Sequence, residues 1–185
     1  IVFMGLFDTV ASVGLPYMVP FAAGHMGWAD GSLRLSDDEA FLEHCVHMVA
    51  AHEQRSCFQV DSIRRKANPD DPMCPSTYRA GTAEYIYPGM HSDVGGGYPP
   101  GDQGMASEGG HEVVSQIALH HMYDEASKVG APLQAPSKIF TEKLKKERPW
   151  LVMSDPTYLE FDVGPTVITR FNTWLNAMDN GPLEE

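Results

Sequence analysis

The chain opens on an apolar run from Ile1 to Phe7 that stops at an acid, Asp8. A nearly uninterrupted apolar run of this length is typical of a strand buried on both faces of a parallel sheet. In open α/β sheets the ligand lies outside the carboxyl ends of the strands. The opening run therefore predicts an α/β fold and places Asp8 at the edge of the sheet where chemistry is expected.

A second β-prone run, Thr82–Tyr87, leads into a glycine-rich segment. The segment His91–Tyr98 contains a histidine, an aspartate and three consecutive glycines, which predicts a tight turn after the strand. Glycine is needed where φ is positive or where another group approaches the backbone closely. Three consecutive glycines lose much conformational entropy on folding, which a purely structural loop would rarely accept. The histidine before them, His91, is the first catalytic candidate.

Asp8 and His91 follow different strands, so their side chains can converge at one edge of the sheet. An acid followed by a histidine is also the back half of the α/β-hydrolase triad, whose order is Ser, then Asp or Glu, then His. In acyl transfer the histidine acts as the base and the acid orients it. We expect His91 to be the base and Asp8 the orienting acid. Otherwise, Asp8 is a turn residue and His91 bonds to the backbone.

Three segments together resemble a known family. They are Gly5–Ser12, which includes Phe-Asp-Thr-Val, the acidic and basic stretch His47–Arg55, and Pro88–Tyr98, which includes His-Ser-Asp-Val-Gly-Gly-Gly-Tyr. In this order they are similar to motifs of the α/β-hydrolase phospholipase effectors of bacterial type VI secretion. The resemblance covers roughly the first 125 residues, and it implies that His47–Arg55 ends a helix.

The resemblance also implies a serine in a Gly-x-Ser-x-Gly elbow upstream of the Asp8 strand. No such elbow occurs in the 185 residues, and neither Ser12 nor Ser92 has its setting. We therefore expect the nucleophile to lie before Ile1, which we expect not to be the natural start. The chain is then an α/β-hydrolase-like fold, a mostly parallel sheet flanked by helices and incomplete at its N-terminus, and it is inactive alone.

The activity implied by the resemblance is ester hydrolysis of membrane phospholipids by an antibacterial effector, without cofactor or metal. The implied partners are a phospholipid surface, an immunity protein, a delivery protein of the secretion apparatus and the missing N-terminal part. The implied location is the producer's cytoplasm before secretion and then the periplasm or envelope of the target cell. The formal charge of −12 argues against a nucleic-acid partner, because nucleic acid rewards positive charge.

Asp93 either orients His91 or bonds within its own turn, and we favour the turn.

Two other functions remain open from the residues. In a metal-assisted hydrolase, Asp8, His91 and Asp93 would ligate a divalent ion. In a non-catalytic module, the acidic surface and the apolar loop Leu15–Trp28 would bind another protein.

The remaining elements are predicted from spacing and breakers. A capping box at Ser36–Glu39 predicts a helix from about Asp37 to His52. A strand is expected at Phe58–Ile63, within a region, 54–80, that we interpret as an insertion. Further helices are expected at 113–129, 138–148 and 166–178, the second with Ile139, Phe140 and Leu144 facing inward. We expect residues 1–130 to form the C-terminal half of a hydrolase domain. Residues 131–185 would be its helical continuation or the start of an accessory region.

Overall fold

The structure is a computed structural model. It describes residues 1–10, 35–36, 38, 40–55, 58, 60–68, 70–71, 73–102 and 105–180. Contacts within the chain divide it into two compact units, Ile1–Gly95 and Gly96–Glu185, which are described separately. The apolar loop Leu15–Trp28 lies outside the described residues, and the expected boundary near residue 130 stays a prediction.

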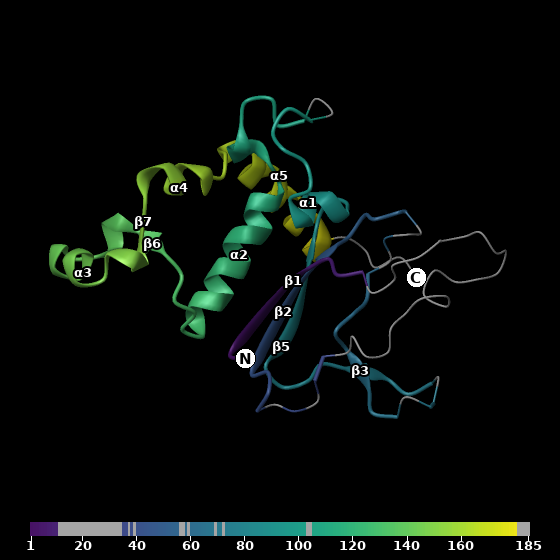
Figure 1. The fold of residues 1–185 in the computed structure, drawn as a ribbon. Coiled ribbons are helices and arrows are strands. Elements are labelled where there is room, and N and C mark those ends of the chain that lie inside the picture. Colours follow the sequence, from purple (N-terminus) through teal and green to yellow (C-terminus); the bar gives the residue numbers. More distant parts are fainter. Residues whose placement is uncertain are drawn as a thin grey trace. The chain divides into compact units, whose positions relative to one another are not determined.

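The first unit is built on a three-stranded sheet with the order β1-β2-β5. The strands are β1 (Phe3–Phe7), β2 (His44–Ala50) and β5 (Thr82–Tyr87). Both pairings are parallel, and the three strands run side by side in Figure 1. The strands predicted from the opening run and from residues 82–87 are confirmed, as is the parallel sheet.

The prediction of a helix over residues 37–52 is wrong, since β2 occupies its second half. The helix expected at His47–Arg55 from the family resemblance is wrong for the same reason. Four consecutive residues of β2, from Cys45 to Met48, are buried. A central strand of a parallel sheet is covered on both faces, so its residues form a continuous buried run instead of a one-sided helical stripe. Asp37 and Glu39 of the expected capping box lie outside the described residues.

The segment between β2 and β5 contains a small antiparallel pair. Its strands are β3 (Arg65–Lys66) and β4 (Ser76–Thr77). The strand predicted at 58–63 is wrong, because the described residues there form a short 3₁₀ turn and irregular backbone. That residues 54–80 form an insertion stays a prediction.

Helix α1 (His91–Gly95) replaces the turn predicted at the glycine-rich segment. The sharp changes of direction lie at its two ends, where Gly89 has φ +113° and Gly96 has φ +75°. Positive φ is the conformation that glycine adopts without a steric penalty. Positive φ therefore favours glycine two residues before α1, at Gly89, and directly after it, at Gly96, whereas Gly95 is an ordinary helical residue.

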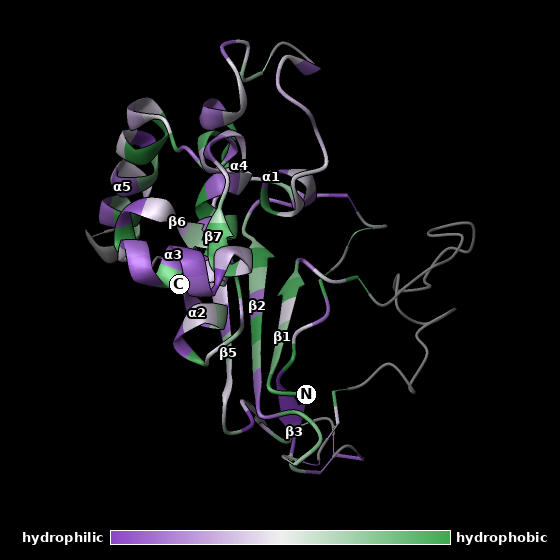
Figure 2. Cartoon of the chain, turned by 60° about the vertical axis from the view of Figure 1, so that its left-hand side comes forward, coloured by the Kyte–Doolittle hydropathy of each residue, from purple (hydrophilic) through white to green (hydrophobic). Residues whose placement is uncertain are grey.

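The core of the first unit lies against β1 and β2. Leu42, Cys45 and Ile63 are buried together, and Met4 and Leu6 of β1 pack on them. Figure 2 shows the hydrophobic colour concentrated along β1 and β2, while β3 is hydrophilic. Burial of this apolar surface stabilises the packing of β1 and β2 in the sheet.

The second unit is mostly helical. Its elements are η3 (Gly110–Glu112), α2 (Ser115–Lys128), β6 (Ala135–Pro136), η4 (Ser137–Ile139), α3 (Glu142–Glu147), η5 (Pro149–Leu151), β7 (Val152–Met153), α4 (Asp155–Glu160) and α5 (Pro165–Asn180). The helices predicted at 113–129 and 166–178 are confirmed. The one predicted at 138–148 is shorter, and Ile139 and Leu144 are 65% and 40% exposed instead of facing inward.

The helices were also compared with the length and apolar character of a membrane span. No helix in the described part of the chain is both long and apolar enough to cross a bilayer.

Candidate active site

Asp8 follows β1 directly and is completely buried. Its backbone N–H donates to the carbonyl of Met48 at 2.7 Å, and its Oδ1 accepts the N–H of Ala50 at 2.9 Å. Its φ is +42°, a value uncommon for a residue with a side chain. Strained backbone of this kind persists where the surrounding structure holds it, and it clusters at functional sites.

His91 is the first residue of α1, and its side chain contacts that of Asp8. Its Nδ1 lies 2.8 Å from Asp8 Oδ2, across 83 positions of sequence. The carboxylate is an acceptor, so the Nδ1 proton is donated to it and Nε2 keeps its lone pair. The His91 side chain remains 32% exposed while that of Asp8 is 1% exposed. The structure thus brings together the two predicted site residues, here called the dyad, with a base nitrogen available.

Glu53 holds the backbone of His91. Its Oε2 accepts the His91 N–H at 3.0 Å. The Arg55 guanidinium donates to the same carboxylate twice, at 2.8 Å and 2.7 Å. These hydrogen bonds from Arg55, partly opposed by burial, lower the pKa of Glu53 to about 2. Glu53 is therefore ionised throughout the ordinary pH range.

Phe58 contacts both the ring of His91 and the guanidinium group of Arg55. The Phe58 and His91 ring centroids are 5.1 Å apart, and the Arg55 Cζ lies 4.2 Å from the Phe58 centroid. Arginine over an aromatic face is a favourable cation–π arrangement. The His91 ring is thus fixed by a carboxylate at Nδ1, by its own backbone and by an aromatic neighbour. Sequence reasoning identified Glu53 and Arg55 only as a charged cluster and missed Phe58.

Asp93 does not join the dyad through any hydrogen bond described in the structure. Its Oδ2 accepts the backbone N–H of Met90 at 2.8 Å. The Gly89 backbone approaches it so closely that an added Cβ would lie 2.5 Å from the Asp93 Cβ. This geometry agrees with the turn role that we favoured. Both carboxylate oxygens of Asp8 are occupied by Ala50 and His91.

Residues 1–125 match the family described as type VI secretion system phospholipase effector, Tle1-like, catalytic domain. The chain belongs to this family. This match confirms the family resemblance predicted from the sequence, and the matched residues include both members of the dyad.

One solved structure is similar to nearly the whole of this Tle1-like chain. It is the crystal structure of an uncharacterized protein from Pseudomonas aeruginosa, with 50% sequence identity and a TM-score of 0.78. The match covers 98% of this chain and 23% of that protein, so the chain spans less than a quarter of its relative. No curated protein matches the chain.

Three side chains of the second unit of this Tle1-like chain have metal-ligand chemistry. Ligand atoms of Glu108, His111 and Glu112 lie within 4.8 Å of one another, and this is the one such group of three within the described ranges. Glu108 is exposed and its backbone N–H bonds to Glu112 within the group. Acidic groups at a surface often gather without an ion, so the group does not by itself indicate a site.

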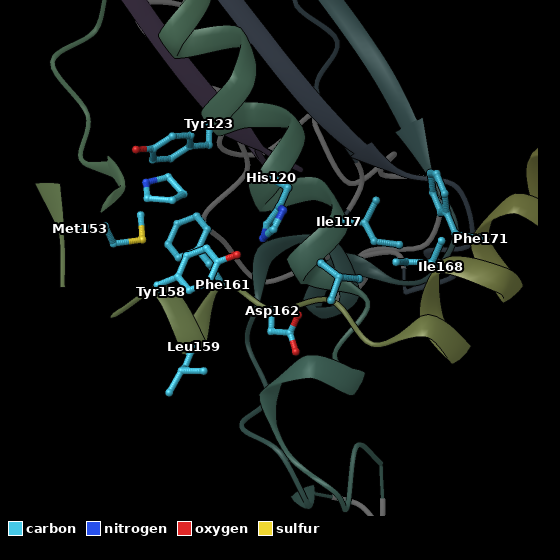
Figure 3. Close-up of a pocket in the computed structure, with 12 residues that line it drawn as sticks. Ile117, His120, Tyr123, Met153, Tyr158, Leu159, Phe161, Asp162, Ile168 and Phe171 are labelled. Atoms are coloured by element: carbon cyan, nitrogen blue, oxygen red, sulfur yellow. The ribbon is translucent and has the colours of Figure 1, made fainter. Parts of the chain in front are cut away.

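The second unit also contains a cavity of about 680 Å³. Its wall is mainly aromatic and aliphatic, and Figure 3 shows it formed in part by side chains of α2 and α5. The Tyr123 hydroxyl is buried and has no hydrogen-bond partner among the described residues, and burial raises the pKa of Tyr123. The cavity suits an apolar group better than a charged one.

Proposed function

We propose that the dyad is the base and orienting acid of a Ser-His-Asp esterase on an α/β-hydrolase fold, which acts on membrane phospholipids. The observation that carries the proposal is the 2.8 Å contact between Asp8 Oδ2 and His91 Nδ1. Membership of a phospholipase effector family supports the substrate class. The nucleophilic serine belongs to a part of the protein outside this chain, so the chain alone is inactive.

The proposed reaction follows from the protonation of the dyad. Nε2 of His91 takes the proton of the serine hydroxyl as the serine oxygen bonds to the ester carbonyl carbon. The resulting imidazolium is stabilised by the carboxylate of Asp8 and then gives its proton to the leaving alcohol as the C–O bond breaks. Water, deprotonated by the same nitrogen, then releases the fatty acid and restores the serine. Asp8 keeps its charge throughout.

The biological setting that we propose follows the family. The enzyme is an antibacterial effector, made in the producer's cytoplasm and delivered to the envelope of a rival cell, with an immunity protein and a delivery protein as partners. With a formal charge of −12, attraction to anionic lipid head groups is disfavoured. Contact with the bilayer therefore relies on apolar surface. No cofactor or metal is required.

The test uses the complete protein, which includes the nucleophile. His91→Ala is compared with the control His121→Ala, a histidine of the second unit that lies outside the cavity lining and whose Nε2 is 3.7 Å from Glu125 Oε1. We expect His91→Ala to lower hydrolysis of a soluble ester and of phospholipid vesicles by at least about 10³-fold, as the loss of a triad base does. The control variant keeps its activity. Undiminished turnover by folded His91→Ala overturns the proposal.

Two further arms of the experiment separate the alternatives. A serine-directed fluorophosphonate abolishes activity of the complete protein if the proposal is correct, and a chelator leaves it unchanged. The opposite pattern identifies a metal-assisted hydrolase at Asp8, His91 and Asp93. A complete protein that hydrolyses no ester but binds a partner tightly is a binding module instead.

A further inference from the structure

His47 in the middle of β2 is completely buried and uses both ring nitrogens. Nδ1 lies 2.9 Å from Glu84 Oε1, on the neighbouring strand β5. Nε2 lies 2.9 Å from the backbone N–H of Thr9. His47 and Glu84 are register partners across the parallel strands, so the sheet itself places the pair. None of these groups belongs to the dyad.

The two contacts determine the protonation of His47. A backbone N–H can only donate, so Nε2 must accept the proton of Thr9. The ring is then neutral, carries its hydrogen on Nδ1 and donates it to the Glu84 carboxylate. In a protonated His47, the Nε2 hydrogen would face the backbone N–H of Thr9. These two donors would then have no acceptor between them.

Several hydrogen-bond donors surround the Glu84 carboxylate and favour its ionised form. Besides His47, it accepts the backbone N–H of Ile63 at 2.8 Å and the hydroxyls of Ser62 and Tyr78 at 2.8 Å and 3.1 Å. Burial raises the pKa of Glu84, but these hydrogen bonds together outweigh burial and leave the pKa below its usual value. The ionised Glu84 carboxylate accepts the Nδ1 hydrogen of His47, so Nε2 remains an acceptor.

Thr9 is the residue next to Asp8, and this adjacency links His47 to the dyad. Asp8 has a left-handed backbone with φ +42°. Such a conformation costs about 1 kcal/mol or more for a residue with a side chain and needs external hydrogen bonds to persist. The bond from Thr9 N–H to His47 fixes the peptide unit that follows Asp8. Relaxation of Asp8 to the ordinary β region would redirect its Cα–Cβ bond and move the carboxylate away from His91.

We propose that His47 and Glu84 are positioning residues for catalysis, which hold the Asp8–Thr9 peptide so that the Asp8 carboxylate meets His91. This inference rests on the proposed function. The pair touches neither substrate nor His91, and it acts through the orientation of Asp8.

The experiment is a double-mutant cycle on the complete protein, read as kcat and KM for a soluble ester. His47→Leu removes both hydrogen bonds. His47→Gln offers an acceptor and a donor on one amide and can restore them. The control is His44→Leu, which changes the histidine at the first position of the same strand. Each variant is also made in the Asp8→Asn background, and folding is checked by thermal unfolding.

We expect His47→Leu to lower kcat about 10- to 100-fold with KM within twofold, because the perturbation reaches the transition state through Asp8. His47→Gln keeps at least a third of kcat, and His44→Leu stays within threefold. In the Asp8→Asn background His47→Leu lowers kcat by less than threefold. Residues that act as one unit are non-additive in this way.

Two results overturn the inference. One is an equal fold-loss from His47→Leu with and without Asp8→Asn. The other is an unchanged kcat in folded His47→Leu. If His47→Leu does not fold, Glu84→Gln replaces it in the cycle and is judged by the same non-additivity. A folded Asp8→Asn protein with full activity would instead remove the proposed function, which separates the two failures.

Discussion

Replacing Asp8 by asparagine changes one atom of the carboxylate and tests the hydrogen-bond logic of the dyad. In the wild type Oδ1 accepts the Ala50 N–H and Oδ2 accepts the His91 Nδ1 hydrogen. Asparagine has one acceptor and one donor group. If its oxygen faces Ala50, its NH₂ donates to Nδ1, which forces the hydrogen of His91 onto Nε2. A histidine in that tautomer cannot accept the proton of a serine.

The size of the effect follows from the cost of turning the amide around. The flipped amide would accept from Nδ1 but would place NH₂ against the N–H of Ala50, leaving two buried donors without an acceptor. Each such donor costs about 1 to 3 kcal/mol, so the productive flip lies about 2 to 6 kcal/mol higher. At about 1.4 kcal/mol per factor of ten, kcat should fall by roughly 30- to 2 × 10⁴-fold.

The assay measures kcat of the complete protein on a chromogenic ester, with thermal unfolding as the check on folding. Asp38→Asn is the matched control, because Asp38 is an exposed aspartate that caps a local turn. It should leave kcat unchanged. A folded Asp8→Asn protein with kcat within threefold of the wild type would refute the reasoning, since the tautomer of His91 would then not depend on Asp8.

Three further predictions concern stability and reactivity. Gly89→Ala should lower the free energy of unfolding by about 2 kcal/mol or more, since φ is +113° and the new Cβ meets a side chain. Gly95→Ala, with nothing within 4 Å, should be neutral or stabilising in the same melts. Peptide mapping after alkylation at pH 8 should show Cys74 modified and Cys45 unmodified, because burial raises the pKa of Cys45 to about 11. The contribution of Glu53 to stability should be complete above about pH 4.5 and be lost as pH falls towards about 2, because folding lowers its pKa. Its Gln variant should show a weaker loss in acid melts.

The two outer strands of the sheet, β1 and β5, and the dyad could be predicted because their sequence signals are local. An apolar run that stops at an acid defines β1 and places Asp8, and the β-prone run before His91 does the same for β5. Parallel strands align their carboxyl ends, so the meeting of the two side chains followed from topology alone. The short helix α1 was missed because its 5 residues span little more than one helical turn and cannot show a repeating apolar pattern.

The central strand could not be predicted from its pattern. Continuous apolar runs do not distinguish a doubly buried strand from a buried helix. The spacing of Phe41, Cys45 and Met48 favours a helix, but Phe41 precedes β2 and is 54% exposed. Because of that error, the role of His47 was missed. Its contact with Glu84 depends on the pairing of β2 with β5, which a helix would not have. Glu53 and Phe58 were missed for a different reason. Their contacts with His91 depend on the path of a loop, and sequence spacing carries no record of a bond to a backbone N–H.

The Ala50 N–H provides a way to observe the dyad without altering it. This amide lies at the end of β2 and donates to the carboxylate that holds His91. Its proton chemical shift responds to the charge on that carboxylate, so isotope labelling of one alanine gives an NMR signal for the ionisation of Asp8. A titration followed at Ala50, with an inhibitor bound and absent, would read the electrostatics of the site from a main-chain atom that takes no part in the reaction.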